Sequence, residues 1–594
     1  MTWSTTSNTV SGRVAGFQIG STGDPDADYD VTYHYDAAGR IARIVGPGLP
    51  AYGVEYSRLT DSDLVEYARY KSDASTTLAT IRRSYEADRD LIDYVQNDTS
   101  GTVSKYDYEN DALGRRVNVV YTGSAFSQNH LFLWGYNPRS ELIAADRHQG
   151  TDPGSPGTQY GTNGAFDYAY DPIGNRESYQ LDGGTATTYT ANNLNQYTAT
   201  ANPTEYFCYD ADGNLIADGK PTSDCNTANG AWKYTWDGEN RLIRVEPAGT
   251  PTSGDKKLEF QYDYRSRRVR KASYTHNGSA WVEDADLLFV YDKWNVVLVL
   301  NANASNATIR RYTWGLDLSG LLGNASISGI HNAGGIGGLL AIEDVGAGGG
   351  SVNSYWYCYD ANGNVGQLIK ASDRSLAAHY EYDPYGNTIT ATGFYAAANP
   401  WRFSTKWHDT DLPGNVLIYY GYRYYSPRLG RWLNRDPIEE LGGLNLYLYM
   451  YNRVNNAAEL WGLGFWDFID CMADCIEDND PIELAIAKAL AMLAGVPLPK
   501  SFVASLAELV GDTTLARRIR GGSPFTTIPS VISTKLRLGG RSALRALGRY
   551  AAPAVVAYGL ALAAIETHCL GWCCGTDHYT SDGNILNEIK RRFF

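Results

Sequence analysis

The chain has 594 residues, a formal net charge of −15 and a pI near 5.1. A surface of this sign repels phosphate, so we predict that the repeat region described below does not bind nucleic acid or anionic membranes. The longest apolar stretch, residues 551–565, is shorter than the roughly 20 residues of a membrane-spanning helix, which argues against a transmembrane span. The first residues lack the basic start and apolar core of a signal peptide, so export by another route or a longer parent chain is expected.

A short phrase recurs along the chain from about residue 30 to 395. The last full copy reads YDPYGNTIT, and full copies begin at Tyr35, Tyr170, Tyr209, Tyr359 and Tyr382. Weaker copies begin at Trp236, Tyr262 and Tyr291. A catalytic motif occurs once in a site, so this repetition predicts an architectural unit.

Each copy is typical of a β-hairpin. A second tyrosine often stands two residues earlier, as Tyr168 does before Tyr170, and a period of two places both rings on one strand face. The aspartate that follows accepts backbone hydrogen bonds, and a glycine three residues later supplies the left-handed backbone that the turn needs. An alternating segment such as 242–245 then leads away as the second strand.

Stacking these hairpins predicts one long coiled sheet, because a single hairpin cannot bury its own face. The 45 tyrosines suit partly dry faces, since a ring buries area while its hydroxyl reaches water or a backbone group. Such a sheet also has long unpaired edges, which favour aggregation unless the sheet closes or is covered. We therefore expect successive turns of the coil to pair edge to edge and close a shell.

The eight cysteines are spread unevenly. Cys208 and Cys225 bracket a short loop and predict a disulfide. Four others form two C-x-x-x-C pairs: Cys471, Cys475, Cys569 and Cys573. This spacing is one helical turn, so we predict two disulfides across a helical hairpin. Free thiols, or a metal site that includes His568 and His578, stay open as alternatives, and we expect no cofactor and no resident metal.

Two other stretches invite a motif search. The glycine-rich segment 318–350 lies among hairpins and lacks the helix of a dinucleotide site, so we interpret it as a bend where backbones pass closely. A basic stripe on a predicted helix consists of Arg537, Arg541, Arg545 and Arg549. This stripe is a solvated face, a surface that docks on the acidic repeat region, or a contact for phosphate.

The segment 421–462 reads GYRYYSPRLGRWLNRDPIEELGGLNLYLYMYNRVNNAAELWG and resembles the core-associated signature of Rhs and YD-repeat proteins. With the YD copies and the glycine-rich segment, the resemblance covers about residues 30–463. It implies a spiral β-sheet wound into a hollow shell, whose core-associated segment curls inward as a plug. In toxin members the shell encloses a variable C-terminal enzyme, whereas the animal relatives, the teneurins, use the shell in adhesion.

The resemblance divides the chain into a YD-repeat β-shell (1–400), a core-associated plug (401–463) and a variable C-terminal domain (464–594). The expected fold class is mainly β, with a small, mainly α C-terminal domain, because alanine and leucine dominate after residue 463. The plug is rich in arginine. We expect its arginines to pair with acids of the negative shell: Arg423, Arg428, Arg431 and Arg435.

Toxin members release the C-terminal part at an aspartyl self-cleaving site, and the matching residues here are Arg435 and Asp436. Such a site needs two carboxylates, one as proton donor and one as base. Relatives carry a second Asp-Pro near the end of the segment, where this chain has Glu459 and Leu460. Because the longer glutamate moves its oxygens by more than about 1 Å, the sequence predicts an uncut chain through Leu463.

Three functions are consistent with these patterns. The first is an exported or cell-surface shell with a structural or encapsulating role, whose C-terminal domain stays docked on or in the shell. The second is a polymorphic toxin whose shell encloses an effector, residues 464–594. The third is an adhesion module that binds a cell-surface glycan or protein. In each case we expect a bacterial protein that is secreted or held at the cell surface.

Overall fold

The computed structural model describes residues 14–20, 29–226, 229–321, 334–346 and 352–463, and the two paired strands β34 (Leu498–Pro499) and β35 (Phe525–Thr526). The chain forms two compact units. One consists of Met1–Ser326 with Asn332–Trp466, and the other of Ile327–His331 with Asp467–Phe594. The predicted α-helical C-terminal domain, the two C-x-x-x-C pairs after residue 465 and the arginine stripe lie outside the described residues.

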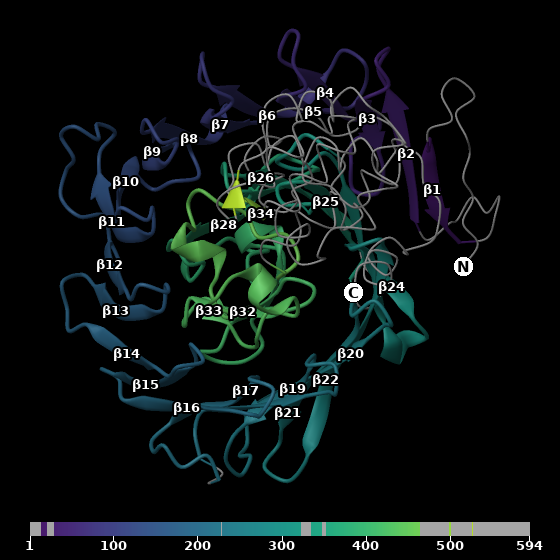
Figure 1. Ribbon diagram of the computed structural model, residues 1–594. Helices are drawn as coiled ribbons and strands as arrows, with labels where there is room; N and C mark the ends of the chain where they lie inside the picture. The colour runs from purple at the N-terminus through teal and green to yellow at the C-terminus, as the bar shows by residue number, and fades with distance from the viewer. Residues whose placement is uncertain are drawn as a thin grey trace, which may run out of the picture. The chain divides into compact units, whose positions relative to one another are not determined.

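A 29-stranded sheet dominates the first unit. Its first fifteen strands are β1 (Gly16–Ile19), β2 (Tyr29–Tyr35), β3 (Ile41–Val45), β4 (Gly53–Arg58), β5 (Val65–Lys71), β6 (Thr77–Tyr85), β7 (Ile92–Asp98), β8 (Thr102–Asn110), β9 (Arg116–Thr122), β10 (His130–Tyr136), β11 (Leu142–Gln149), β12 (Ala165–Tyr170), β13 (Arg176–Leu181), β14 (Thr187–Ala191) and β15 (Tyr197–Ala201). The others are β16 (Glu205–Tyr209), β17 (Leu215–Lys220), β18 (Trp232–Trp236), β19 (Leu242–Pro247), β20 (Lys256–Tyr262), β21 (Arg268–His276), β22 (Trp281–Asp292), β23 (Asn295–Asn301), β24 (Ala307–Trp314), β25 (Leu339–Asp344), β26 (Asn353–Tyr359), β27 (Val365–Lys370), β28 (Leu376–Tyr382) and β29 (Thr388–Thr392). Each strand pairs antiparallel with the next one along the chain, so the predicted series of hairpins is confirmed (Figure 1).

The YD phrase forms the predicted turn, as the copy at Asp383 shows. The Gly386 N–H donates to the Asp383 carbonyl (3.0 Å), and Gly386 has a φ of 90°, where glycine alone is unstrained. The Asp383 carboxylate accepts the N–H groups of Tyr385 and Asn387, both at 2.9 Å. Its other oxygen accepts the Asn387 side chain at 2.7 Å. This is a three-residue hairpin loop that ends in a left-handed residue and a bulge.

The structure shows a further partner of the YD aspartate that the sequence did not predict: the side chain of the fourth residue after it. There an arginine or asparagine side chain bonds the second aspartate oxygen, as in Arg40 to Asp36 (2.9 Å) and Asn214 to Asp210 (2.9 Å). The same contact recurs for Arg115, Asn175, Arg241, Arg267 and Asn364. The repeat is therefore held by side-chain bonds as well as by the turn.

The YD tyrosines also join neighbouring hairpins. The Tyr170 hydroxyl donates to the Leu142 carbonyl (2.8 Å) and the Tyr382 hydroxyl to the Val365 carbonyl (2.8 Å), in each case at the first residue of the preceding strand. The predicted placement of paired tyrosines on one face is confirmed, because the rings of Tyr380 and Tyr382 stack at 6.3 Å. Each of these tyrosines therefore contributes in two ways: its ring packs against another ring, and its hydroxyl bonds a backbone carbonyl of the preceding strand.

The sheet does not close by edge pairing, so that expectation was wrong. Among the described strands β1 pairs with β2 alone and β29 with β28 alone. Early strands instead pack face to face on late ones, with the Tyr29 hydroxyl on the Tyr312 carbonyl (2.9 Å) and the Tyr70 hydroxyl on the Leu340 carbonyl (3.0 Å). In Figure 1, β25 and β26 lie next to β4–β6 on the inner side of the curve. Bulky tyrosines on the sheet faces favour this stacking, because rings between two layers bury more area than an edge contact.

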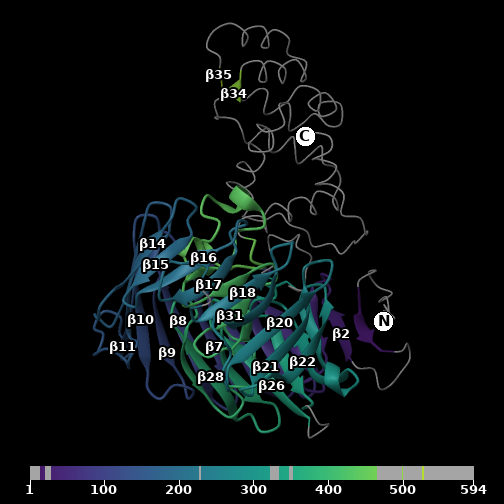
Figure 2. The same cartoon turned by 90° about the horizontal axis from the view of Figure 1, so that it is seen from below.

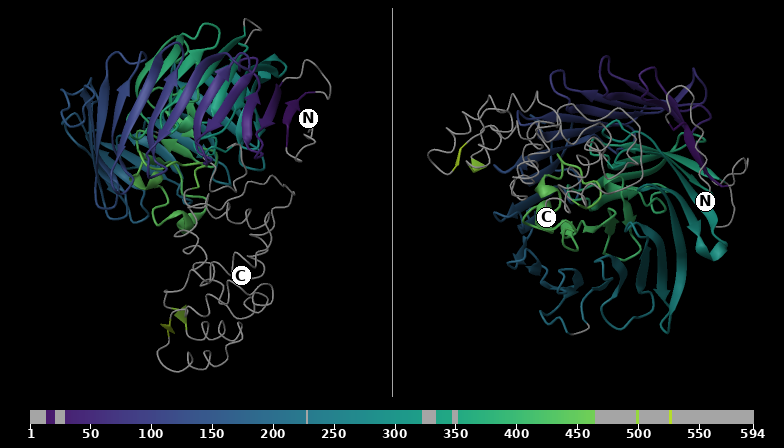
Figure 3. Two further views of the ribbon diagram at one scale, coloured as in Figure 1. Left: turned by 90° about the horizontal axis from the view of Figure 1, so that it is seen from above. Right: turned by 45° about the vertical axis from the view of Figure 1, so that its right-hand side comes forward.

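The plug forms a small separate sheet inside the curve of the large one (Figures 1, 2 and 3). Its strands are β30 (Trp407–Asp409), β31 (Leu417–Tyr419), β32 (Tyr424–Ser426) and β33 (Arg431–Trp432). Short 3-10 helices are η1 (Ala302–Ala304) in the large sheet and η2 (Phe403–Thr405), η3 (Glu439–Gly442) and η4 (Met450–Asn452) in the plug. The plug bonds several parts of the sheet, including Asn445 to Asn175 (2.9 Å) and Tyr447 to the Gly213 carbonyl (2.7 Å).

Candidate self-cleavage site

The plug's end, where the family resemblance implies a cut, is held by a buried arginine. Arg423 precedes β32 and is 2% exposed. Its Nη2 lies 2.7 Å from Oδ2 of Asp436, and its Nε donates to the Gly462 carbonyl. The guanidinium packs 4.2 Å from the Trp432 ring. One side chain therefore joins the candidate catalytic aspartate to the carbonyl of the 462–463 peptide.

The nitrogen of the same peptide is held by Glu459. One carboxylate oxygen of this buried side chain accepts the N–H of Gly462 (3.0 Å) and that of Leu463 (3.2 Å). The sequence reading counted Glu459 as a missing second carboxylate. In the structure the longer side chain folds back over its own turn, so both ends of the Gly462–Leu463 peptide bond have a charged partner.

Burial governs the electrostatics of this site. Desolvation raises the pKa of Asp436 above its ordinary value, although Arg423 acts in the opposite direction. The pKa of Tyr451 is also raised, first by burial and then by the charges of both Asp436 and Glu459. The two carboxylates thus act on one phenol, which places them in the same neighbourhood. An aspartate that keeps its proton more readily is suited to donate it.

Arg435, the arginine that the sequence pattern named, lies elsewhere. It is exposed, and its aliphatic carbons pack against the turn at Gly213. Arg423, thirteen residues before Asp436, contacts its carboxylate instead. Arg428 does pair with shell acids as expected, namely Glu205 and Asp218 (2.7 Å). Only the folded structure shows that Arg423 is buried beside Asp436, so the sequence alone could not identify it as the arginine that contacts this aspartate.

A residue of the large sheet holds the chain just before this peptide. Trp294, in the turn between β22 and β23, packs 5.1 Å from Trp461 and 4.8 Å from Tyr422. The Trp461 carbonyl accepts the Tyr422 N–H (3.0 Å), and Lys406 Nζ donates to the Leu460 carbonyl (2.5 Å). Residues 460 and 461 are therefore held in place just before the candidate cut.

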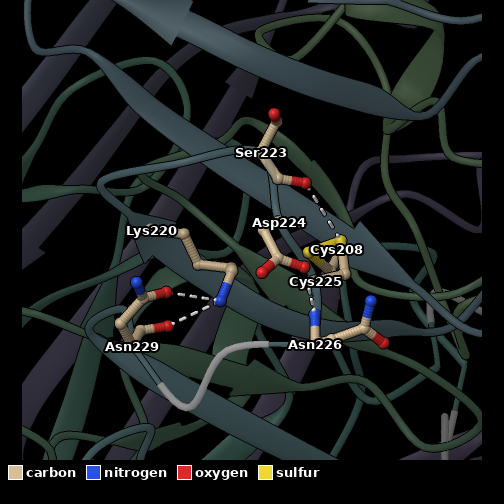
Figure 4. The surroundings of a disulfide bond; sticks show 7 residues. All are labelled: Cys208, Lys220, Ser223, Asp224, Cys225, Asn226 and Asn229. Carbon is tan, nitrogen blue, oxygen red and sulfur yellow. Dashed lines mark hydrogen bonds between the residues drawn. A yellow bond between two sulfur atoms is a disulfide. The ribbon is translucent and has the colours of Figure 1, made fainter.

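The disulfide between Cys208 and Cys225 is present, in a loop where Lys220 also bonds Asn229 (Figure 4). Cys358 is a free, buried thiol whose pKa is raised to about 12 by burial. Within the described ranges no group of histidine, cysteine and acidic side chains could hold a metal ion, and no helix is long and apolar enough to cross a membrane.

Comparisons with known proteins point to toxins. The tRNA3(Ser)-specific nuclease WapA of Bacillus spizizenii is 28% identical over 307 residues, which are 51% of this chain and 11% of that protein. Toxin subunit YenC2 of Yersinia entomophaga is 28% identical over 242 residues, 40% of this chain and 22% of that protein. The crystal structure of TcdB2-TccC3 matches 76% of this chain and 22% of that chain, with a TM-score of 0.56 at 18% identity, and so shares the fold.

These similarities span less than a quarter of each relative's length. No family model matches the chain. The repeat, the sheet and these relatives together support the resemblance of this chain to Rhs and YD-repeat proteins.

Proposed function

We propose that this chain is the shell of a toxin-type Rhs protein that carries residues 464–594 as its effector and cuts itself between Gly462 and Leu463. The relatives support the toxin part, because one is named as a nuclease and another as a toxin subunit. They favour this function over a purely structural shell with a retained C-terminal domain. Secretion is consistent with these relatives, and binding to a glycan or a protein partner stays a prediction.

The proposal of self-cleavage rests on the contacts that Arg423 and Glu459 make with the Gly462–Leu463 peptide. Arg423 donates to the Gly462 oxygen, where negative charge develops when water attacks the carbonyl carbon. Glu459 would take a proton from that water and pass it to the Leu463 nitrogen, which it already contacts at 3.2 Å. Asp436, with its raised pKa, would supply a proton toward the oxyanion and recover it when the C–N bond breaks. The net reaction is hydrolysis of one peptide bond.

Trp294 should position the scissile peptide without touching the reacting atoms. The Trp294→Ala variant is expected to cut its chain about 10- to 100-fold more slowly, because loss of the ring frees residues 460–462. The rate is followed on denaturing gels after refolding, with Trp281→Ala as the matched control, since Trp281 lies at the start of β22 against His276. A shell-borne positioning residue should leave the pH profile of cleavage unchanged. Equal rates in the two variants would remove Trp294 from this role.

The effector part has its own test. Residues 463–594 and residues 1–462 are expressed separately from an inducible promoter in a bacterial host, and growth and protein level are followed. We expect growth arrest from residues 463–594 and normal growth from residues 1–462. If residues 463–594 accumulate in cells that grow normally, the effector assignment is wrong, whatever the outcome for cleavage.

A further inference from the structure

A cavity of about 230 Å³ lies between strands β12 and β13 of the sheet and the start of β29. Its wall is mostly apolar and aromatic: Phe166, Tyr168, Tyr179, Leu181, Tyr385 and Ile389. The polar groups that reach it include two guanidinium groups, from Arg176 in the sheet and Arg428 in the plug. Apolar walls with few polar groups are typical of small-molecule sites.

The two arginines differ in what they already bind. Arg428 is committed to Glu205 and Asp218. Arg176 is only 5% exposed, and within the described part of the chain no acidic side chain forms a direct ion pair with it, although Tyr385 contacts it and the charge of Asp383 acts on it. Its Nη2 is buried without a partner, and its charge is faced by the rings of Tyr385 (4.3 Å) and Tyr168 (5.0 Å). A buried guanidinium without a directly bonded anion carries a large desolvation penalty.

Two neighbouring features fit an absent partner for Arg176. The Tyr168 hydroxyl, also at the cavity wall, is buried and has no hydrogen-bond partner among the described residues. Gly430 of the plug leaves room for the guanidinium, since a Cβ at this position would lie 2.2 Å from Nη2. The backbone of Gly430 has a φ of 64°, which a larger residue would strain. The plug therefore accommodates a charged group whose Nη2 has no hydrogen-bond partner among the described residues.

We propose that this cavity binds a small organic carboxylate, with its carboxylate on Arg176 and its apolar body between the tyrosine rings. A planar guanidinium with free donors matches a carboxylate in charge and shape. The aromatic walls favour a ligand with a flat apolar body over a fully polar anion such as phosphate. The volume suits a molecule about the size of a single aromatic acid.

Asp383 makes the affinity depend on pH. It also lines the cavity, and burial raises the pKa of its carboxyl to about 6, against the hydrogen bonds from Asn387. Because this pKa is raised, Asp383 is neutral below about pH 6 and repels an anion above it. The other charged or titratable groups that face it, Arg176 and the phenols of Tyr168, Tyr179 and Tyr425, keep their charge state in this range. Binding should therefore weaken as the pH rises through about 6.

The test uses benzoate as the probe and benzamide as its uncharged isostere, with the full chain in a calorimetric titration. We expect benzoate to bind at least about tenfold more tightly than benzamide, and more tightly near pH 5 than near pH 7.5. Arg176→Met should remove the preference for benzoate, whereas Arg428→Met should keep it. The comparison of the two probes on the unchanged chain needs no variant and holds even if Arg176→Met unfolds.

Several results would overturn the proposal. These are equal binding or no binding of the two probes to the unchanged chain, tighter binding of inorganic phosphate than of benzoate, or full benzoate binding by a folded Arg176→Met chain. A benzoate affinity that rises with pH would also contradict the role of Asp383. The site is independent of self-cleavage, so neither outcome bears on the proposed function.

Discussion

The Asp436→Asn variant should stay uncut, while the unchanged chain yields a fragment of residues 463–594. Amide substitution keeps the size of the side chain but removes the proton that Asp436 supplies, and general acid–base groups contribute about 10²- to 10⁴-fold in rate. Glu459→Gln should have a similar effect, because the amide cannot carry a proton from water to the Leu463 nitrogen. Fragment release is timed on denaturing gels from the moment of refolding.

The matched control is Glu440→Gln, an exposed acid in η3 of the same loop, which should cut at the unchanged rate. The rate should also fall as the pH rises above the raised pKa of Asp436, since only the protonated acid can donate. Cleavage that persists in both Asp436→Asn and Glu459→Gln would place the chemistry elsewhere.

Changing Asp409 to Asn should strongly lower the free energy of unfolding, because it weakens the contact between the plug and the large sheet. Asp409 of β30 is fully buried and pairs with Arg268 (2.5 Å) and Lys271 (2.8 Å) of β21. Removal of one partner from a buried ion pair typically costs about 3–5 kcal/mol, because the opposite charges stay buried without compensation. The midpoint of denaturant unfolding, followed by tryptophan fluorescence, measures this loss.

The partly exposed pair Arg244 and Glu259 provides the control. Glu259→Gln should cost no more than about 1 kcal/mol, as exposed pairs do. Burial opposes ionisation of Asp409, but Arg268 and Lys271 outweigh it and lower its pKa. A lowered pKa means that the stabilisation is complete above the unfolded pKa of about 4 and is lost as the pH falls below it. A cost below about 1 kcal/mol for Asp409→Asn would contradict the account.

The hairpin unit was predictable because it is a local property of the chain. Spacing alone placed Tyr168 and Tyr170 on one face and Asp383 at the start of a turn, and the backbone follows that local chemistry. The disulfide between Cys208 and Cys225 was predictable for the same reason, since the loop that it closes is short. Local patterns set strands and turns without knowledge of the rest of the fold.

Contacts between distant parts of the chain were not predictable. Edge closure was expected from the general hazard of unpaired strands, yet Tyr29 and Tyr70 pack the early strands onto the faces of late ones. Glu459 was discounted because it replaces an aspartate, and only the folded turn shows its carboxylate on the Leu463 N–H. Arg435 was chosen for its position next to Asp436, whereas Arg423 reaches that aspartate through space.

The most direct test of the central claim is the mass of the purified full chain, dissolved in denaturant after native folding. If Asp436 and Glu459 cut the Gly462–Leu463 bond, the spectrum contains two species whose masses add up to the chain plus one water. The smaller species begins at Leu463 by N-terminal sequencing. A single species at 65.3 kDa, as the sequence pattern alone predicted, would contradict the account.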